Sequence, residues 1–255
     1  MEAKDIVALV LSTAAFCLSI YATVRGERKS NDERQRTVRG QLTDVLGKLT
    51  ALALEGAKIQ HEAKDERNFL QAVSQILGQQ NGFLLDQAVY LSEQIPNLVT
   101  TYEFNTIAGA NATAGNLLLA EKYFTKAVEV APNALYTALA VRSYAVFLYP
   151  QGRLNEGREQ FRRAVDLLKG EDNFIRWTKG LTYQAWALSE LNFARSPEKA
   201  SEYFENARKE FASIDADAVR NTALASLEAA RHFPTSQQLG PNASLPTTAS
   251  LAVRL

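Results

Sequence analysis

Three stretches of the chain share one pattern of small and large apolar residues. In the first, Ala120, Phe124 and Ala127 recur at the i, i+4, i+7 spacing of a single helix face, and Pro132 ends the helix. The same order of small, large and small returns twice: Gly157, Phe161 and Ala164, then Ala200, Phe204 and Ala207. Two small residues let a neighbouring helix approach closely, while the Phe fills the space between them. The recurrence predicts a stack of helical hairpins.

A complementary stretch precedes each of these helices. It carries two large residues, a small one and a further contact at helical spacing: Phe104, Ile107, Ala108 and Asn111; Val141, Tyr144, Ala145 and Leu148; Tyr183, Trp186, Ala187 and Glu190. Gly115 with Leu117, and Gly152 with Leu154, lie between the halves of the first two hairpins. The Gly permits a tight turn, and we expect the Leu to plug the hairpin.

In these residues, over about 101–214, the chain resembles the tetratricopeptide repeat (TPR) family. The resemblance implies a right-handed superhelix of antiparallel hairpins whose first helices line a concave groove that binds peptides or helices of other proteins. The motif starts Ala120, Gly157 and Ala200 are 37 and 43 residues apart, against ~34 for a regular repeat. The third repeat is also one residue longer between its Ala positions, and Ser196 and Pro197 replace the turn Gly. We therefore expect altered packing of the third hairpin.

The resemblance places a partner-binding groove on the first-helix residues that point away from the hairpin contacts. These are Tyr102, Asn105, Arg142, Val146, Tyr149, Gln184, Leu188 and Asn192. Tyr and Arg are enriched among binding hot spots because they combine buried area with hydrogen bonding. In the alternative interpretation, Val146 and Leu188 are ordinary core under a closing helix. Only Arg142 is basic in this set, so we do not expect a groove that grips a C-terminal carboxylate.

An uncharged stretch begins at Ile6 and ends at Val24. Because ~20 helical residues cross ~30 Å of hydrocarbon, residues 6–24 are predicted to form a single-pass transmembrane helix. The alternatives are a buried core helix and a cleaved signal peptide, the latter disfavoured by Glu2 and Asp5. A run of basic residues follows: Arg25, Arg28, Lys29, Arg34, Arg36 and Arg39. Since Lys and Arg stay on the cytoplasmic side, the C-terminal domain is predicted to be cytoplasmic.

From Val38 onward, apolar or small residues recur at spacings that alternate between four and three: Val38, Leu42, Val45, Leu49, Leu52, Gly56, Ile59 and Ala63. This heptad predicts a long amphipathic helical stalk, and a homo-oligomer that forms a coiled coil through residues 38–59. The alternative is a helix that folds back on its own domain.

Residues 78–82 (GQQNG) have the composition of a turn. We expect one helix before them and a second from Phe83 to Ile95, together a degenerate hairpin that caps the array. The predicted domains are the membrane helix (6–24), the basic segment and stalk (25–78) and the repeat domain (83–233). A closing helix with Leu224 and Leu227 ends the repeat domain, and the Pro-containing polar tail 234–255 is predicted to be disordered.

Composition excludes several classes of function. The chain has 28 basic and 28 acidic residues, so it lacks the basic excess of a nucleic-acid binder. Its one cysteine, Cys17, excludes an intrachain disulfide and a Cys-based zinc site. His61 and Asp65 lie four apart, but we do not expect a metal site there. The sequence has no phosphate loop and no nucleophile with a nearby His, so we expect neither enzymatic activity nor a cofactor.

The sequence thus predicts an all-α, membrane-tethered scaffold for protein–protein interaction. It would bind a peptide or helix of a cytosolic protein in its groove. One alternative is a structural subunit that assembles through stalk and membrane span, and another is a receptor for a small peptide signal.

Overall fold

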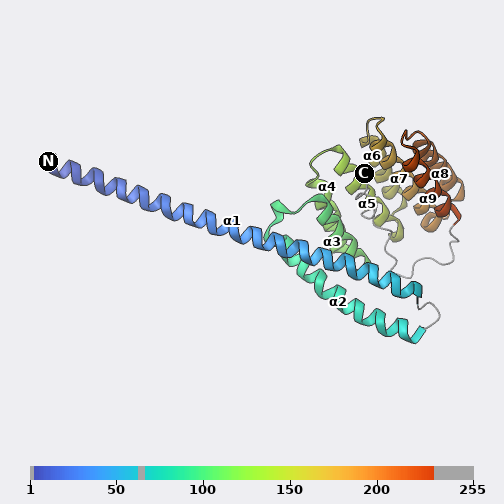
Figure 1. The fold of residues 1–255 in the computed structure, drawn as a ribbon, viewed down its shortest axis with the longest axis horizontal. Coiled ribbons are helices and arrows are strands. Elements are labelled where there is room, and N and C mark those ends of the chain that lie inside the picture. Colours follow the sequence, from blue (N-terminus) through green and yellow to red (C-terminus); the bar gives the residue numbers. More distant parts are fainter. Residues whose placement is uncertain (1–2, 63–66, 233–255) are drawn as a thin grey trace.

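The computed structural model describes the backbone of residues 3–62 and 67–232, and the side chains of residues 31–59, 62 and 70–231. Within these residues the fold is all-α (Figure 1). The α-helices are α1 (Ala3–Glu62), α2 (Arg67–Gln94), α3 (Thr101–Thr113), α4 (Leu117–Glu129), α5 (Ala134–Leu148), α6 (Leu154–Leu167), α7 (Asn173–Ser189), α8 (Pro197–Ala212) and α9 (Asp217–His232). Two short 3-10 helices, η1 (Pro96–Leu98) and η2 (Tyr149–Gln151), and one π-helix, η3 (Glu190–Ala194), extend or join them.

Helices α3 to α8 form three hairpins in chain order, α3 with α4, α5 with α6 and α7 with α8. The small and large residues that predicted these hairpins are buried on the second helices: Ala120, Phe124, Ala127, Gly157, Phe161, Ala164, Ala200, Phe204 and Ala207. The close approach is direct at Gly157, where an added Cβ would lie 2.6 Å from the ring of Tyr149. Such a distance leaves no room for a methyl group, so the small residue is required by packing.

The first two hairpins turn at a glycine with left-handed backbone, Gly115 at φ +82 and Gly152 at φ +74. The amide of the next residue donates to the carbonyl five positions back, Asn116 to Asn111 and Arg153 to Leu148. This is a Schellman motif, which satisfies the last carbonyls of the first helix. Leu154 packs on the core as predicted, but Leu117 is 45% exposed and does not plug the first hairpin.

The third hairpin accommodates its extra residue in η3. The amide of Ser196 donates to Glu190 six positions back, and Arg195 rather than a glycine takes the left-handed conformation at φ 51. Pro197 then opens α8, where its fixed φ suits the first helical turn. The lengthened third turn seen in the sequence is therefore a π-helical bulge.

The turn predicted at residues 78–82 is wrong, because this segment lies within helix α2. The helix runs unbroken through this segment, and neither Gly78 nor Gly82 has any atom within 4 Å of an added Cβ. A helical Gly costs only ~1 kcal/mol. Leu84, Leu85 and Ala88 in the next turns join the core, so packing against α1 offsets that cost. One long helix replaces the two predicted short ones.

The heptad face of α1 is covered by α2. Leu42, Val45 and Leu49 are buried in one core with residues of α2 to α5, as the fold-back alternative requires. Arg39 fixes the docking, donating to Glu103 at 2.6 Å and to the carbonyl of Leu98 at 2.8 Å. Of the face predicted for self-association, 38–59, the part from Val38 to Leu49 is thus packed within the chain. The predicted boundary between stalk (25–78) and repeats (83–233) falls inside α2. Helices α1 and α2 both contribute to the core of the first hairpin.

At the other end, α9 closes the last hairpin as predicted. Ala223 and Leu227 are buried against α8, and Leu224 packs beside them. The predicted tail, 234–255, lies outside the described residues. So do the side chains of the predicted span, 6–24, whose backbone forms the N-terminal part of α1. In the part of the chain that the structure describes, no helix is long and apolar enough to cross a membrane.

Candidate partner-binding face

Three polar residues occupy the same position on successive first helices. Asn105 on α3, Arg142 on α5 and Gln184 on α7 each lie three residues before the small Ala of the hairpin contact. Helices α3 and α5 contact each other, as do α5 and α7, so the three positions follow one side of the stack (Figure 1). Asn192 in η3 is a fourth member of the predicted groove on this run of helices. We call these four residues the first-helix face.

The first-helix face holds buried polar atoms without hydrogen-bond partners in the described part of the chain. They are Oδ1 of Asn105, Nη1 of Arg142, Oε1 of Gln184 and Oδ1 of Asn192. A fifth such atom, Oγ1 of Thr101, lies elsewhere on α3. Because buried polar groups in folded proteins are nearly always paired, an unpaired set on one run of helices needs a reason. The amide oxygens accept hydrogen bonds, and the guanidinium donates them.

Arg142 is the charged member of the face. Burial of its guanidinium lowers the pKa of Arg142 to about 10. No carboxylate in the described residues forms an ion pair with it, whereas most other arginines of the hairpins have one, such as Arg153 with Glu121. A buried cation without an anion is costly, and a ligand carboxylate or carbonyl would offset that cost.

The other predicted groove residues divide between surface and core. Tyr102 is 56% exposed on α3. Val146 packs against the aromatic cluster around Phe161, and Leu188 packs on the core that α9 covers. Val146 and Leu188 are therefore core residues, as the alternative interpretation predicted.

Tyr149 is a correction to the predicted groove. Its side chain is 1% exposed, and its hydroxyl donates to Glu190 Oε1 at 2.7 Å. It lies at the end of α5 in η2, where the helix tightens and carries the ring inward against Gly157. Tyr149 therefore belongs to the interior of the stack and is not available to a partner.

Glu190 is the centre of a buried polar network between the second and third hairpins. It is 0% exposed, and Arg158 of α6 donates to both of its carboxylate oxygens, at 2.7 and 2.8 Å. Trp186 Nε1 donates to the Tyr149 hydroxyl at 3.0 Å and to Glu190 at 3.3 Å. We call these four residues the Glu190 network. The sequence indicated Glu190 as a hairpin contact but gave no sign of Arg158, which follows the small Gly157.

The pKa shifts in the network have clear causes. Burial acts to raise the pKa of Glu190, but hydrogen bonds from Arg158 and Tyr149 outweigh it and leave the pKa below its ordinary value. Burial and the hydrogen bond to Glu190 raise the pKa of Tyr149. The hydrogen bond with Glu190 raises the pKa of Arg158. The network is therefore a stable ion pair at neutral pH, without a group poised for proton transfer.

Stacked rings surround the network. Phe161 stacks on Trp186 with centroids 5.4 Å apart, and Trp186 stacks on Tyr203 at 3.9 Å. The rings come from α6, α7 and α8, so they join the second hairpin to the third. This packing buries the Glu190 carboxylate completely, while the Arg158 side chain stays 22% exposed, and it gives the network a structural role.

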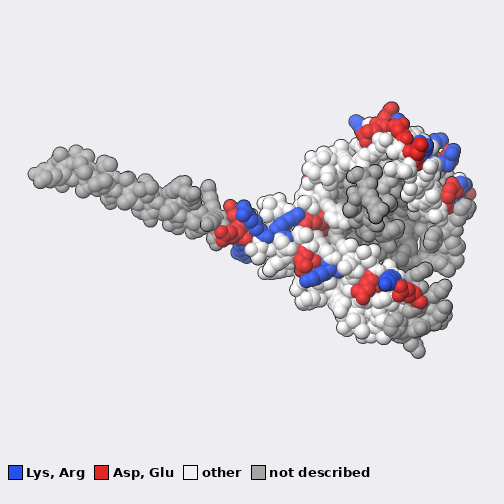
Figure 2. Space-filling model, viewed as in Figure 1, with Lys and Arg blue, Asp and Glu red and all other residues white. Residues whose placement is uncertain are grey.

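Charges of both signs alternate on the described surface. Figure 2 shows Lys and Arg next to Asp and Glu along α1 and around the outer edge of the hairpins. Several are paired, including Lys48 with Asp44 and Lys122 with Glu93. Among the described residues, no group of three or more His, Cys, Asp or Glu is placed to hold a metal ion. The His61–Asp65 pair lies outside the described side chains.

Comparison with models of protein families, with curated proteins and with solved structures finds no match to this chain.

Proposed function

We propose that this protein is a membrane-tethered scaffold whose first-helix face binds an extended peptide or a helix of a cytosolic partner protein. The observation that carries the proposal is the set of buried atoms on Asn105, Arg142, Gln184 and Asn192 that have no partner among the described residues. The resemblance of the hairpins to TPR repeats supports the same face, because first helices line the binding groove in that family.

The chemistry of the four groups fits a peptide. Leaving a buried donor or acceptor unpaired costs ~1–3 kcal/mol, and a bound ligand that pairs it recovers that energy. Three amide oxygens call for N–H donors, which a peptide backbone presents in series. Arg142 calls for a carboxylate or a carbonyl. The preferred ligand is thus a peptide segment with an acidic side chain.

The tether is the uncharged stretch 6–24. The backbone of α1 continues from Ala3 to Glu62, so a membrane span would be joined by one helix to the docked α1–α2 pair. The basic residues after the stretch favour a cytoplasmic position for the hairpins. Protease added to sealed right-side-out cells should leave the hairpins intact, and cleavage there would overturn this orientation.

Peptide binding is testable with the full-length chain in detergent. A library of random 12-residue peptides displayed on phage is panned against the protein, and enriched peptides are measured by fluorescence anisotropy. Loss of one hydrogen bond to a charged group is worth ~1.5–3 kcal/mol, so Arg142→Ala should weaken binding at least tenfold. Asn105→Ala and Gln184→Ala should weaken it less.

Arg163→Ala is the matched control. Arg163 is an exposed arginine on α6, a second helix, and its loss should leave peptide affinity unchanged. Equal enrichment on the Arg142→Ala protein, or equal losses for Arg142→Ala and Arg163→Ala, would overturn the proposed face.

A further inference from the structure

Helix α2 carries a second apolar stripe besides the one that packs on α1. Ile76, Phe83 and Tyr90 recur every seven residues and are 56%, 64% and 63% exposed. Gln80 and Gln87 lie between them, which completes a heptad spacing of four and three. We call these five residues the α2 seam.

The covered stripe lies one residue further along the helix. Leu84 and Leu91 pack on the core, and Leu77 Cδ1 lies 3.5 Å from the Cβ position of Gly56 on α1. Both stripes have coiled-coil spacing, but only one has a partner in the described chain. The α2 seam is therefore a helix face with the pattern of an interface that no described residue covers.

The composition around the α2 seam also resembles an interface. Over its 28 residues, α2 contains three charged residues, Arg67, Asp86 and Glu93, and none of them is in the seam. Depletion of charged residues with large aromatic residues present is the mark of an interface core. An exposed helix that faced only water would carry charges at such positions.

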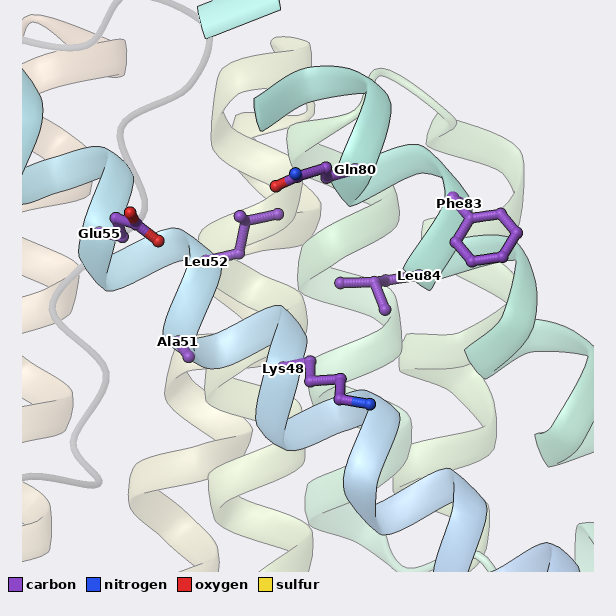
Figure 3. A pocket seen from close by; sticks show the side chains of 7 residues that line it. All are labelled: Lys48, Ala51, Leu52, Glu55, Gln80, Phe83 and Leu84. Carbon is purple, nitrogen blue, oxygen red and sulfur yellow. The ribbon is translucent and has the colours of Figure 1, made fainter. Parts of the chain in front are cut away.

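A pocket opens beside the seam, between α1 and α2 (Figure 3). It has a volume of about 350 Å³ and is lined by Lys48, Ala51, Leu52, Glu55, Gln80, Phe83 and Leu84. Phe83 stands at its rim and is mostly exposed, so a protruding ring and an apolar hollow lie next to each other on one surface. Coiled coils interlock in this way, with a side chain of one helix entering a hollow on its neighbour.

We propose that the α2 seam binds the α2 seam of a second copy of this chain, in parallel about a two-fold axis. A two-fold interface uses the same patch on both subunits, so the patch must hold both the protrusion and the hollow. The pairing of like residues brings no like charges together. Gln80 and Gln87 would each face their own copy, and an amide both donates and accepts, so each pair is complementary. The parallel direction rests on the proposed membrane tether.

This surface differs from the apolar face of residues 38–59, which is on α1 and packs into the core from Val38 to Leu49. It also lies apart from the first-helix face, since α2 contributes no residue to that face. A dimer through α2 would leave both groups of hairpins free to bind peptides.

The test is disulfide crosslinking of full-length protein in detergent, on a Cys17→Ser background. Single variants Ile76→Cys, Phe83→Cys and Tyr90→Cys are oxidised, and dimers are counted on non-reducing gels. Leu118→Cys on α4 is the control, because Leu118 is 87% exposed and outside the seam. A parallel dimer should crosslink at all three seam positions at least tenfold above Leu118→Cys.

Two results would overturn the proposal. One is crosslinking at all seam positions no higher than at Leu118→Cys, and the other is crosslinking at a single position, which indicates antiparallel helices. Adding Phe83→Glu to the Ile76→Cys variant should reduce crosslinking at least tenfold, while circular dichroism and thermal unfolding stay unchanged. Peptide affinity of the Phe83→Glu variant should also stay unchanged. Crosslinking therefore tests the dimer, and peptide affinity tests the first-helix face separately.

Discussion

The Glu190 network and the first-helix face both contain buried polar atoms, but only the buried atoms of the network have hydrogen-bond partners among the described residues. Glu190 receives two hydrogen bonds from Arg158, one from Tyr149 and one from Trp186, all within the chain. The buried atoms of Asn105, Arg142 and Gln184 form no hydrogen bond with the described residues. A paired buried charge joins hairpins and maintains the fold. A buried polar atom without a partner is a cost to the free protein that binding would remove, which is why recognition is the role we propose for the second region.

The largest effect should follow removal of the central carboxylate of the network. Glu190→Ala leaves the Arg158 guanidinium and the Tyr149 hydroxyl without their acceptor, while Trp186 keeps its bond to the Tyr149 hydroxyl. Breaking this pair should lower the free energy of unfolding by ~3–5 kcal/mol. Denaturant unfolding of the full-length protein in detergent measures it. Glu159→Ala is the control, because its pair with Arg162 is exposed and should be worth less than ~0.5 kcal/mol. Similar losses for the two variants would remove the distinction between a structural network and a surface pair.

Arg142→Met on the first-helix face should raise the free energy of unfolding, whereas Glu190→Ala lowers it. The substitution removes a partly exposed guanidinium whose buried Nη1 atom has no described partner, and it keeps the volume. The free energy of unfolding should therefore rise by ~1–2 kcal/mol while peptide binding is lost. The same unfolding measurement serves, combined with fluorescence anisotropy. A fall in stability of more than ~1 kcal/mol would mean that Arg142 supports the fold, and the comparison between the two regions would fail.

Segment η3 contributes one residue to each region, Glu190 to the network and Asn192 to the face. Its end is strained, because Arg195 holds φ 51, where a side chain costs ~1–2 kcal/mol. Arg195→Gly should therefore raise the free energy of unfolding by ~1 kcal/mol and leave peptide affinity unchanged. Gly152→Ala, at the equivalent turn of the second hairpin, should lower the free energy of unfolding by a similar amount. Weaker peptide binding in Arg195→Gly would show that the strained turn positions Asn192.

The smallest expected effect is on how the free energy of unfolding depends on pH below neutrality. Hydrogen bonds lower the pKa of Glu190 below its ordinary value of 4.5, so the unfolded chain takes up a proton at a higher pH than the folded one. The stability from Glu190 is fully present above about pH 4.5 and is lost as the pH falls through the folded pKa. Unfolding free energies between pH 7 and pH 3 should fall less steeply for Glu190→Gln than for the natural chain. Equal slopes would mean that the carboxylate is not held as an ion pair.

Local patterns were enough to predict the three hairpins and their buried faces. Ala127, Phe161 and Ala207 lie where their spacing placed them, because helical periodicity assigns each residue to a face without knowledge of its neighbours. The same holds for Gly115 and Gly152, since a left-handed turn residue is a local requirement. The break predicted at residues 78–82 failed because a local weakness was offset by packing on a helix distant in sequence. Leu77, Leu84 and Leu91 continue at heptad spacing across that segment and contained the signal for one helix.

Hydrophobic spacing and turn residues determined that this protein is a stack of helical hairpins and which positions can be buried. Tertiary structure decided what lies against each face. It turned Tyr149 inward to Glu190 and packed Val38 to Leu49 into the core with α2. The buried polar atoms at positions 105, 142 and 184 have no hydrogen-bond partner among the described residues. The physical reason is range: a helix face follows from bonds within four residues, whereas its partner depends on contacts between helices far apart in the chain.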